Sequence, residues 1–249
     1  MIEPKETKQE RDERKRQART GRRFILVVGL VIMAVAFIFG GVWLAGQDKD
    51  SGAGAVADVA AITAADQVRG ATTTARAVLI EYSDFQCPAC AAYEPLMAEV
   101  VTAYGDRGLA LVYRHYPLSQ HNKALLMAQA AEAAAAQGKF WEMHDLIFAK
   151  QAEWTTKSLA EAETTIAGFA RTLGLEPKKF ATDLVADATS DKIKADMASG
   201  ERAGVAATPT FYLNGRFFKA GTAGEFKAAI EAALAENNDS VATTTENSN

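Results

Sequence analysis

The sequence predicts an α/β domain preceded by a single transmembrane helix. Three features support this fold class: an uninterrupted apolar segment near the N-terminus, two strand-like apolar runs separated by a helical pattern, and an Asn-Gly hairpin that follows a long helical segment. The chain has 249 residues, of which 49% are hydrophobic and 23% are charged. This composition is typical of a globular protein and excludes a wholly disordered or collagen-like chain.

The N-terminal part of the chain predicts a basic head, a membrane-spanning helix and a flexible linker. The head, residues 1–23, contains nine Lys or Arg and five acidic residues. Residues 24–44 are uncharged and apolar, and at ~1.5 Å per residue such a helix measures roughly 31 Å, which matches the hydrocarbon core of a bilayer. A cleaved signal peptide is the alternative, but its apolar region is normally shorter, about 7–15 residues. Residues 45–66 are rich in Ala, Gly, Ser and Asp and predict the linker.

The charge distribution predicts the orientation of this signal-anchor. Lys and Arg near an apolar span stay on the cytoplasmic side. We therefore expect a single-pass protein of the cytoplasmic membrane, with its N-terminus in the cytoplasm and its folded domain on the periplasmic or outer side. The rest of the chain contains eighteen basic and twenty-six acidic residues. A basic head on an acidic body can indicate nucleic-acid binding, but the adjoining apolar span favours the membrane, and we expect no nucleic-acid partner.

The folded domain, residues 67–237, begins with a strand–helix–strand pattern. Residues 77–82 (AVLIEY) form a short apolar run that is typical of a buried strand. Residues 91–104 are compatible with a helix. Residues 109–116 (LALVYRHY) predict a second strand, and Pro117 ends it.

The second half of the domain predicts a helical insertion, a hairpin and a final helix. The insertion covers about residues 118–205, with helical patterns at 122–137, 140–148, 159–173, 177–186 and 191–203. The strands 210–213 and 216–219 flank Asn214-Gly215, a strong hairpin signal. A helix from about 223 to 236 follows, and the polar residues 238–249 predict a disordered tail.

The only two cysteines form the sequence Cys87-Pro88-Ala89-Cys90, between the first predicted strand and the first predicted helix. The start of a helix offers unpaired N–H groups and the positive end of the dipole, which lower the pKa of a thiol there below its free value of about 8.5. Pro88 suits the first turn because the N–H that it lacks has no partner there. Pro88 and Ala89 thus belong to the first turn of the helix, whose dipole acts on the Cys87 thiol. We expect Cys87 to be the exposed nucleophile and Cys90, one turn deeper, to be the buried resolving thiol.

Three other roles of the cysteines remain open. The two cysteines could be half of a zinc site, but such a site has four ligands. Only His115, His121 and His144 could supply nitrogen ligands, and we expect no metal. A static disulfide would close so small a loop that it would add little stability. Two inert buried thiols are unexpected in an oxidising compartment.

Four segments, EYSDFQCPACAAYEP, YRHYPL, GKFWEMHDLIF and GVAATPTFYLNG, together resemble the DsbA-type thiol:disulfide oxidoreductases, most closely their membrane-anchored bacterial branch. The resemblance covers roughly residues 68–236. It implies a thioredoxin fold with a helical insertion between the CxxC half and the hairpin half, in agreement with the order of elements above. Strong oxidants of this family often carry His where this chain has Ala89, which argues against extreme oxidising strength.

The resemblance also implies roles for three residues outside the CxxC motif. Thr208-Pro209 would form a cis-proline loop beside the disulfide, where the Thr208 backbone, turned outward, pairs with an extended substrate segment. An ordinary trans proline at the start of a strand is the alternative. Glu81 lies six residues before Cys87. Its residue type alone suggests an edge strand or an exposed face, whereas the resemblance implies a buried acid that moves the proton of the resolving cysteine.

The function that the resemblance implies is thiol–disulfide exchange with reduced or misoxidised extracytoplasmic proteins, most directly as an oxidant that needs no cofactor. A membrane quinone-linked thiol oxidase would reoxidise the pair. A reductase, supplied with electrons by a membrane thiol reductant, is an open alternative because direction depends on the reduction potential and the partner. A tethered module that binds peptides or a metal without turnover is another.

Overall fold

The computed structural model describes residues 61–72 and 74–246. The expected head, the expected membrane span and most of the expected linker lie outside these residues. Within the described part of the chain, no helix combines the length and the apolar character that crossing a membrane requires.

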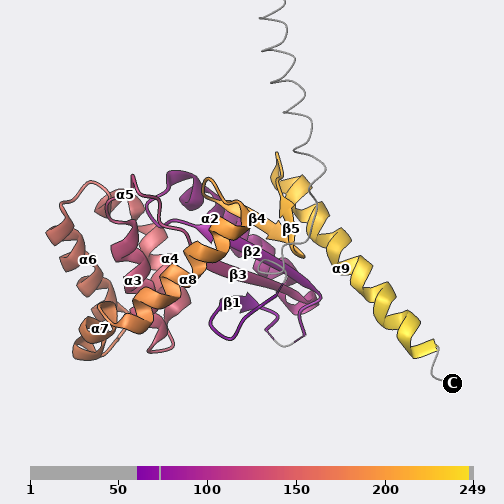
Figure 1. The fold of residues 1–249 in the computed structure, drawn as a ribbon, viewed down its shortest axis with the longest axis horizontal. Helices are drawn as coiled ribbons and strands as arrows, with labels where there is room; N and C mark the ends of the chain where they lie inside the picture. The colour runs from indigo at the N-terminus through magenta and orange to yellow at the C-terminus, as the bar shows by residue number, and fades with distance from the viewer. Residues whose placement is uncertain (1–60, 73, 247–249) are drawn as a thin grey trace, which may run out of the picture. The chain divides into compact units, whose positions relative to one another are not determined.

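A five-stranded mixed sheet forms the centre of the domain (Figure 1). Its strands, in the order β1-β3-β2-β4-β5, are β1 (Gln67–Gly70), β2 (Ala77–Ser83), β3 (Leu109–His115), β4 (Thr210–Leu213) and β5 (Arg216–Phe218). β2 and β3 are parallel, and the other neighbours are antiparallel. The sequence predicts every strand except β1, whose four residues (QVRG) contain a single large apolar side chain and therefore carry no strand pattern.

Helices connect the two halves of the sheet, and the expected helical insertion is confirmed. α2 (Pro88–Tyr104) and a 3₁₀ turn, η2 (Gly105–Arg107), join β2 to β3. The insertion between β3 and β4 comprises α3 (Ala124–Ala135), α4 (Phe140–Ala149), α5 (Gln151–Trp154), α6 (Leu159–Thr172), α7 (Pro177–Leu184) and α8 (Asp187–Ala203). α9 (Ala223–Glu246) follows the hairpin.

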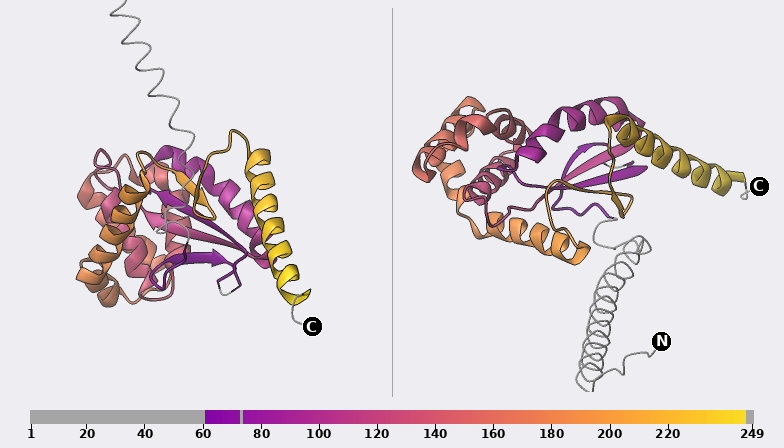
Figure 2. Two further views of the ribbon diagram at one scale, coloured as in Figure 1. Left: turned by 45° about the vertical axis from the view of Figure 1, so that its right-hand side comes forward. Right: turned by 90° about the horizontal axis from the view of Figure 1, so that it is seen from above.

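Both faces of the sheet are covered (Figure 2). On one face, Leu79 and Leu111 of the strands pack against Val100 of α2 and Phe226 and Ile230 of α9. The other face packs against the end of α8 through a cluster of Ile80, Tyr82, Val112, Val205 and Tyr212. β2 is therefore buried on both sides, which explains its almost continuous apolar sequence.

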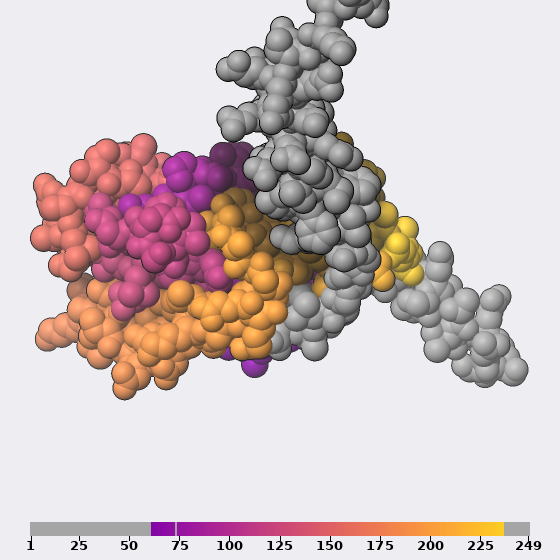
Figure 3. All heavy atoms as spheres, turned by 45° about the horizontal axis from the view of Figure 1, so that its top comes forward, coloured from indigo at the N-terminus to yellow at the C-terminus, as the bar shows by residue number. Residues whose placement is uncertain are grey.

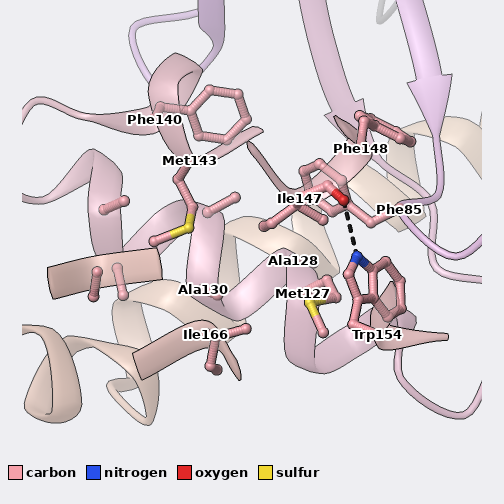
Figure 4. Close-up of a cluster of buried hydrophobic side chains, with 14 of the residues drawn as sticks. Phe85, Met127, Ala128, Ala130, Phe140, Met143, Ile147, Phe148, Trp154 and Ile166 are labelled. Atoms are coloured by element: carbon pink, nitrogen blue, oxygen red, sulfur yellow. Dashed lines mark hydrogen bonds between the residues drawn. The ribbon is translucent and has the colours of Figure 1, made fainter. Parts of the chain in front are cut away.

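The helices of the insertion pack around a hydrophobic core (Figure 4). The same cluster of buried residues includes both cysteines. Trp154 is fully buried there, and its Nε1 donates a hydrogen bond of 2.8 Å to the carbonyl oxygen of Ile147. Phe85, just before the CxxC motif, stacks on Tyr113 of β3 with ring centroids 5.3 Å apart. On the surface, the helices of the insertion lie together on one side of the domain (Figure 3). The insertion and the redox turn thus share one packed core.

The last helix is longer than the sequence indicates. α9 continues to Glu246, past the expected end near Glu236 and into the range for which a disordered tail is expected. No glycine or proline follows Gly224 in the sequence, so nothing in this segment stops a helix.

Candidate active site: a CxxC pair at the start of a helix

The two cysteines lie at the start of α2, as the sequence predicts. Cys87 is the residue before the helix, with an extended backbone (φ −73°, ψ 120°), and Pro88 begins the first turn. The N–H of Cys87 donates a hydrogen bond of 3.0 Å to the carbonyl oxygen of Asp84. The N–H groups of Ala89 and Cys90 are directed at the Cys87 sulfur.

Both thiols are reduced and buried. Cys90 is fully buried, in agreement with the prediction, whereas Cys87 is 7% exposed. The expectation that Cys87 is an exposed side chain is therefore wrong for this state of the protein. Its sulfur is covered by Thr208, which lies in contact with it. Cys87 is still the more accessible of the two sulfurs.

The loop before β4 lies against the redox pair. The Thr208–Pro209 bond is cis, which confirms the expectation from the family resemblance. β4 pairs with β2 through Thr210 and Tyr82, and this pairing brings the loop to the end of β2 that carries the CxxC motif. When Cys87 is protonated, its thiol donates a hydrogen bond of 3.4 Å to the carbonyl oxygen of Thr208, although 121 positions separate the two residues.

The orientation of Thr208 differs from the expectation. Its carbonyl oxygen lies 3.4 Å from the Cys87 sulfur and faces the redox pair instead of turning outward. Thr208 itself is 9% exposed, whereas Ala206 and Ala207 before it are exposed. The exposed residues of this loop next to the redox pair are therefore the two alanines, and the carbonyl oxygen of Ala207 accepts a hydrogen bond of 2.7 Å from the hydroxyl of Thr210.

The surroundings of the two thiols separate their acidities. A hydrogen bond from the Cys90 thiol, together with the N–H groups of Cys90 and Ala89, lowers the pKa of Cys87 from 9.0 to about 5, against the opposing effect of burial. Burial raises the pKa of Cys90 far above its ordinary value, and the negative charges of Cys87 and Glu81 add to this. At neutral pH the pair is one thiolate and one thiol.

Cys87 is expected to stay ionised down to about pH 5, and thiolate absorbance of the reduced protein against pH measures this. The unfolded chain keeps the Cys87 proton up to about pH 9, so the stability of the reduced protein rises with pH between these two values. This contribution is lost as the pH falls through about 5, and it is absent in Cys87→Ala. Alkylation of Cys90 before Cys87 at mildly acidic pH would contradict the assignment.

Glu81 lies in the central strand β2, flanked by β3 and β4. Its side chain is 1% exposed, and its Oε1 has no hydrogen-bond partner. The edge or exposed position suggested by residue type is therefore wrong, and the burial implied by the resemblance is confirmed. Burial raises the pKa of Glu81 to about 7, and the nearby charge of Cys87 acts in the same direction. A carboxyl group that titrates near neutral pH can both accept and release a proton.

Gln151 of α5 belongs to the site, although no sequence pattern predicts it. Its Nε2 donates hydrogen bonds of 2.8 Å to the carbonyl oxygen of Phe85 and 2.9 Å to that of Cys87. These two carbonyl groups flank the turn that presents the nucleophile, so Gln151 fixes this turn to the helical insertion. Because 64 positions separate Gln151 from Cys87, only the folded structure shows the contact.

Gln151→Ala is expected to loosen the turn before α2. The carbonyl group of Phe85 would lose this donor, and that of Cys87 would keep only the 3.3 Å hydrogen bond from the N–H of Ala91. Leaving a buried carbonyl unpaired costs about 1–3 kcal/mol of stability. The pKa of Cys87 would rise, because the N–H groups that stabilise its thiolate would be held less firmly. Glu153→Ala, an exposed change on the same helix, is the matched control. If Gln151→Ala leaves both the melting temperature and the Cys87 titration unchanged, this role is wrong.

Zinc ligation by the cysteines finds no support in the described residues. Within residues 61–72 and 74–246, one group of three or more potential metal ligands is found, and it consists of Glu94, His144 and Asp145. Both carboxylate oxygens of Asp145 already accept hydrogen bonds from Arg69, at 3.0 and 2.9 Å. His144 is 2% exposed and packs among aromatic rings.

The sequence matches a known protein family, and the fold is similar to that of several solved structures. Residues 63–232, more than half of the chain, match the thioredoxin family. Similar solved structures include oxidised BdbD from Bacillus subtilis, with a TM-score of 0.61 and 21% identity over 68% of this chain and 93% of that chain. Another is α-DsbA1 from Wolbachia pipientis, with a TM-score of 0.64 and 19% identity over 72% of this chain and 96% of that one. The catalytic domain of ScsC from Proteus mirabilis has a TM-score of 0.58 and 18% identity, over 72% and 94% of the two chains.

The curated relatives are longer proteins. The Na⁺/H⁺ antiporter NhaA 1 of Salinispora arenicola is 38% identical over 152 residues, which cover 61% of this chain and 22% of that protein. The NhaA antiporter of Herminiimonas arsenicoxydans is 37% identical over 151 residues, with 61% and 22% covered. This chain thus spans about a fifth of the length of these relatives. On the family match, the strand order and the CxxC pair beside a cis-proline loop, the chain belongs to the thioredoxin family, with the DsbA-like fold of the thiol:disulfide oxidoreductases.

Proposed function

We propose that this protein is a membrane-tethered thiol:disulfide oxidoreductase that oxidises extracytoplasmic proteins through its Cys87–Cys90 pair. One observation carries the proposal: the Cys87 sulfur lies at the start of α2, accepts a hydrogen bond from the Cys90 thiol and has a pKa of about 5. A stabilised thiolate favours the reduced enzyme, and therefore makes the disulfide form a better oxidant.

The reaction is a pair of thiol–disulfide exchanges. A substrate thiolate attacks the Cys87 sulfur, the Cys87–Cys90 bond breaks, and Cys90 leaves with the electron pair. A second substrate thiolate then attacks the substrate sulfur of this mixed disulfide, which forms the substrate disulfide and releases Cys87 as a thiolate. The substrate loses two electrons and the enzyme gains them. Attack falls on Cys87 because it is the more accessible sulfur and the better leaving group in the second step.

Glu81 is the proton carrier of the buried thiol. Cys90 must take up a proton when it leaves, because burial keeps its pKa far above neutral. When a partner reoxidises the pair, the same proton must leave again before Cys90 can attack. Glu81 is buried, has a free oxygen and titrates at about pH 7, which suits both transfers.

The loop before β4 is the proposed substrate platform, with Thr208 and Pro209 beside the Cys87 sulfur. Main-chain groups of the exposed Ala206 and Ala207 can pair with an extended peptide. An apolar groove lies between α2 and the segment after β5, and its lining includes Tyr93, Leu96 and Phe226. Reduced or misoxidised proteins expose extended, apolar segments of the kind that these two surfaces accept.

The membrane tether, the extracytoplasmic location and the redox partner extend this proposal. The apolar span at residues 24–44 supports the tether, and a tethered enzyme has a raised local concentration near a membrane quinone-linked thiol oxidase. We do not propose ion transport for this protein, because the chain matches only about a fifth of the length of the antiporters.

Protease treatment of intact spheroplasts is expected to remove the C-terminal domain while the N-terminal head stays protected. The reason is the excess of Lys and Arg before the span, which holds the head in the cytoplasm. A mature protein that begins after residue 55 and is recovered in the soluble fraction would contradict the anchor.

The oxidant function is tested by adding the oxidised protein in stoichiometric amount to a reduced, unfolded protein whose native state needs disulfides. The expected result is disulfide formation in the substrate with loss of the Cys87–Cys90 disulfide. A reductase would instead leave the substrate reduced and would need a thiol donor for turnover. A binding module would keep its peptide affinity in Cys87→Ala and would exchange no disulfide.

A further inference from the structure

A second carboxyl group, that of Glu94, lies beside the redox site and has no part in the mechanism above. Glu94 follows Cys90 by four residues, about one turn of α2, so the two side chains lie on the same face of the helix. Its Oε1 is buried without a hydrogen-bond partner, whereas the side chain as a whole is 18% exposed. Glu94 therefore reaches from the interior of the domain to its surface.

The contacts of His144 favour a protonated Glu94. Nδ1 of His144 donates a hydrogen bond of 2.9 Å to Asp145, whose carboxylate also holds Arg69. With this proton on Nδ1, a neutral His144 carries no proton on Nε2. Nε2 is buried without a hydrogen-bond partner and lies 3.7 Å from Oε1 of Glu94, a separation that a small side-chain rotation closes. A protonated Glu94 is the donor that this nitrogen lacks.

The electrostatic surroundings of Glu94 also favour its protonated form. Burial and the charges of Glu81 and Asp145 raise the pKa of Glu94 to about 9, against the opposing charge of Arg69. Burial lowers the pKa of His144 to about 4, although its hydrogen bond to Asp145 opposes this. Near neutral pH both groups are therefore uncharged, and Glu94 holds a proton that it can release.

Tyr113 of β3 lies between Glu81 and the Glu94–His144 pair. It is the register partner of Glu81 on the adjacent strand, and its ring centroid is 4.8 Å from that of His144. The hydroxyl of Tyr113 and Oε1 of Glu81 are also buried without partners. Internal water commonly bridges buried polar groups of this kind. Unpartnered polar atoms on β2, β3, α2 and α4 are thus the candidate members of a proton route from the redox pair toward the surface.

We propose, on the basis of the function proposed above, that Glu94 is the exit for the proton that Cys90 loses when the pair is reoxidised. Cys90 gives its proton to Glu81 as its sulfur bonds to the Cys87 sulfur, and the two electrons go to the oxidant. Glu81 passes a proton along the route, and Glu94 releases its own proton to solvent as it takes up the incoming one. One proton enters the route and one leaves it. His144 is a positioning residue that holds the protonated Glu94.

Several titratable and charged groups face this route, and each can affect its pH dependence. They come from every element packed around Glu94 and comprise Arg69 on β1, Glu81 on β2, Asp84 in the loop before α2, Cys87 and Cys90 at the start of α2, Tyr113 and His115 on β3, Glu132 on α3, and His144 and Asp145 on α4.

The test follows thiol and proton release together when the reduced full-length protein reacts with dithiobis(nitrobenzoate). Each exchange step releases one coloured aromatic thiolate, first when Cys87 attacks and then when Cys90 closes the disulfide. The second step also frees the Cys90 proton, which an indicator dye detects in weakly buffered solution. In the wild type, the second thiolate and the proton are expected to appear together. In Glu94→Gln, the first thiolate is expected at the wild-type rate and the proton roughly tenfold or more later.

Two further variants complete the experiment. Glu94→Asp keeps a titratable carboxyl and should restore most of the proton release, whereas Glu99→Gln, an exposed change on the same helix, should behave like the wild type. Proton release at the wild-type rate in Glu94→Gln would overturn the proposal, as would equally slow release in Glu94→Asp, which would indicate a purely structural effect. Failure of the first thiolate step in the wild type would instead contradict the proposed function.

Discussion

Cys90→Ala is expected to accumulate mixed disulfides between Cys87 and its substrates. The nucleophile keeps its place at the start of α2, but the intramolecular thiol that would displace the substrate is gone. The adducts should appear as high-molecular-weight bands on non-reducing gels of cells and should collapse when a reductant is added. The expected effect is large, because Cys90 in the wild type should resolve each mixed disulfide before it accumulates.

Cys87→Ala and the double variant Cys87→Ala/Cys90→Ala are the controls, and neither should form adducts. Loss of Cys90 also removes the thiol that donates a hydrogen bond to the Cys87 sulfur, so the pKa of Cys87 should rise in the single variant. Trapping is therefore carried out above pH 8, where the thiolate persists. Adducts that form through Cys90 in Cys87→Ala would reverse the two roles.

Glu81→Gln is expected to slow closure of the Cys87–Cys90 disulfide by about a hundredfold near neutral pH, the low end for a positioned proton-transfer group. The amide has the shape of the carboxyl group but cannot accept the Cys90 proton. In the wild type, the rate should rise as the pH passes through about 7, where Glu81 loses its proton. The variant should lack this rise, while attack by Cys87 on a disulfide stays at the wild-type rate.

The same substitution should stabilise the fold. Because burial raises the pKa of Glu81 from 4.5 to about 7, the unfolded state loses this proton at a lower pH than the native state does. The wild type therefore loses stability as the pH rises from 4.5 to 7, and Glu81→Gln escapes this loss, which corresponds to about 3 kcal/mol above pH 7. A variant that closes its disulfide at the wild-type rate and gains no stability would show that Glu81 is neither the proton acceptor nor a strained buried acid.

The parts of the site that follow from local rules could be predicted from the sequence. A cysteine followed by proline after an apolar strand marks the start of a helix, and the structure places Cys87 and Pro88 there. The Asn-Gly pair between two apolar runs marks a hairpin, and β4 and β5 flank it. The burial of Glu81 needed the family resemblance, because residue type alone favours an exposed carboxylate.

The contacts that join distant segments could not be predicted. Gln151 reaches the redox turn across 64 positions, and the residues around it in the sequence, polar except for the alanines and the buried Trp154, give no signal for this contact. The Thr208 carbonyl faces a sulfur that lies 121 positions away in the sequence. Glu94 is different, since its position one turn after Cys90 was visible in the sequence, but only the buried partners from β2, β3 and α4 show why a carboxyl group there matters.

The reduction potential of the Cys87–Cys90 pair tests the central claim most directly. It is measured by equilibrating the protein with mixtures of reduced and oxidised glutathione and quantifying the free thiols. A thiolate held at a pKa of about 5 beside a buried thiol predicts a potential well above the value of about −270 mV that is typical of thioredoxin. A potential at or below that value would make the pair a reductant and contradict the proposed direction of electron flow.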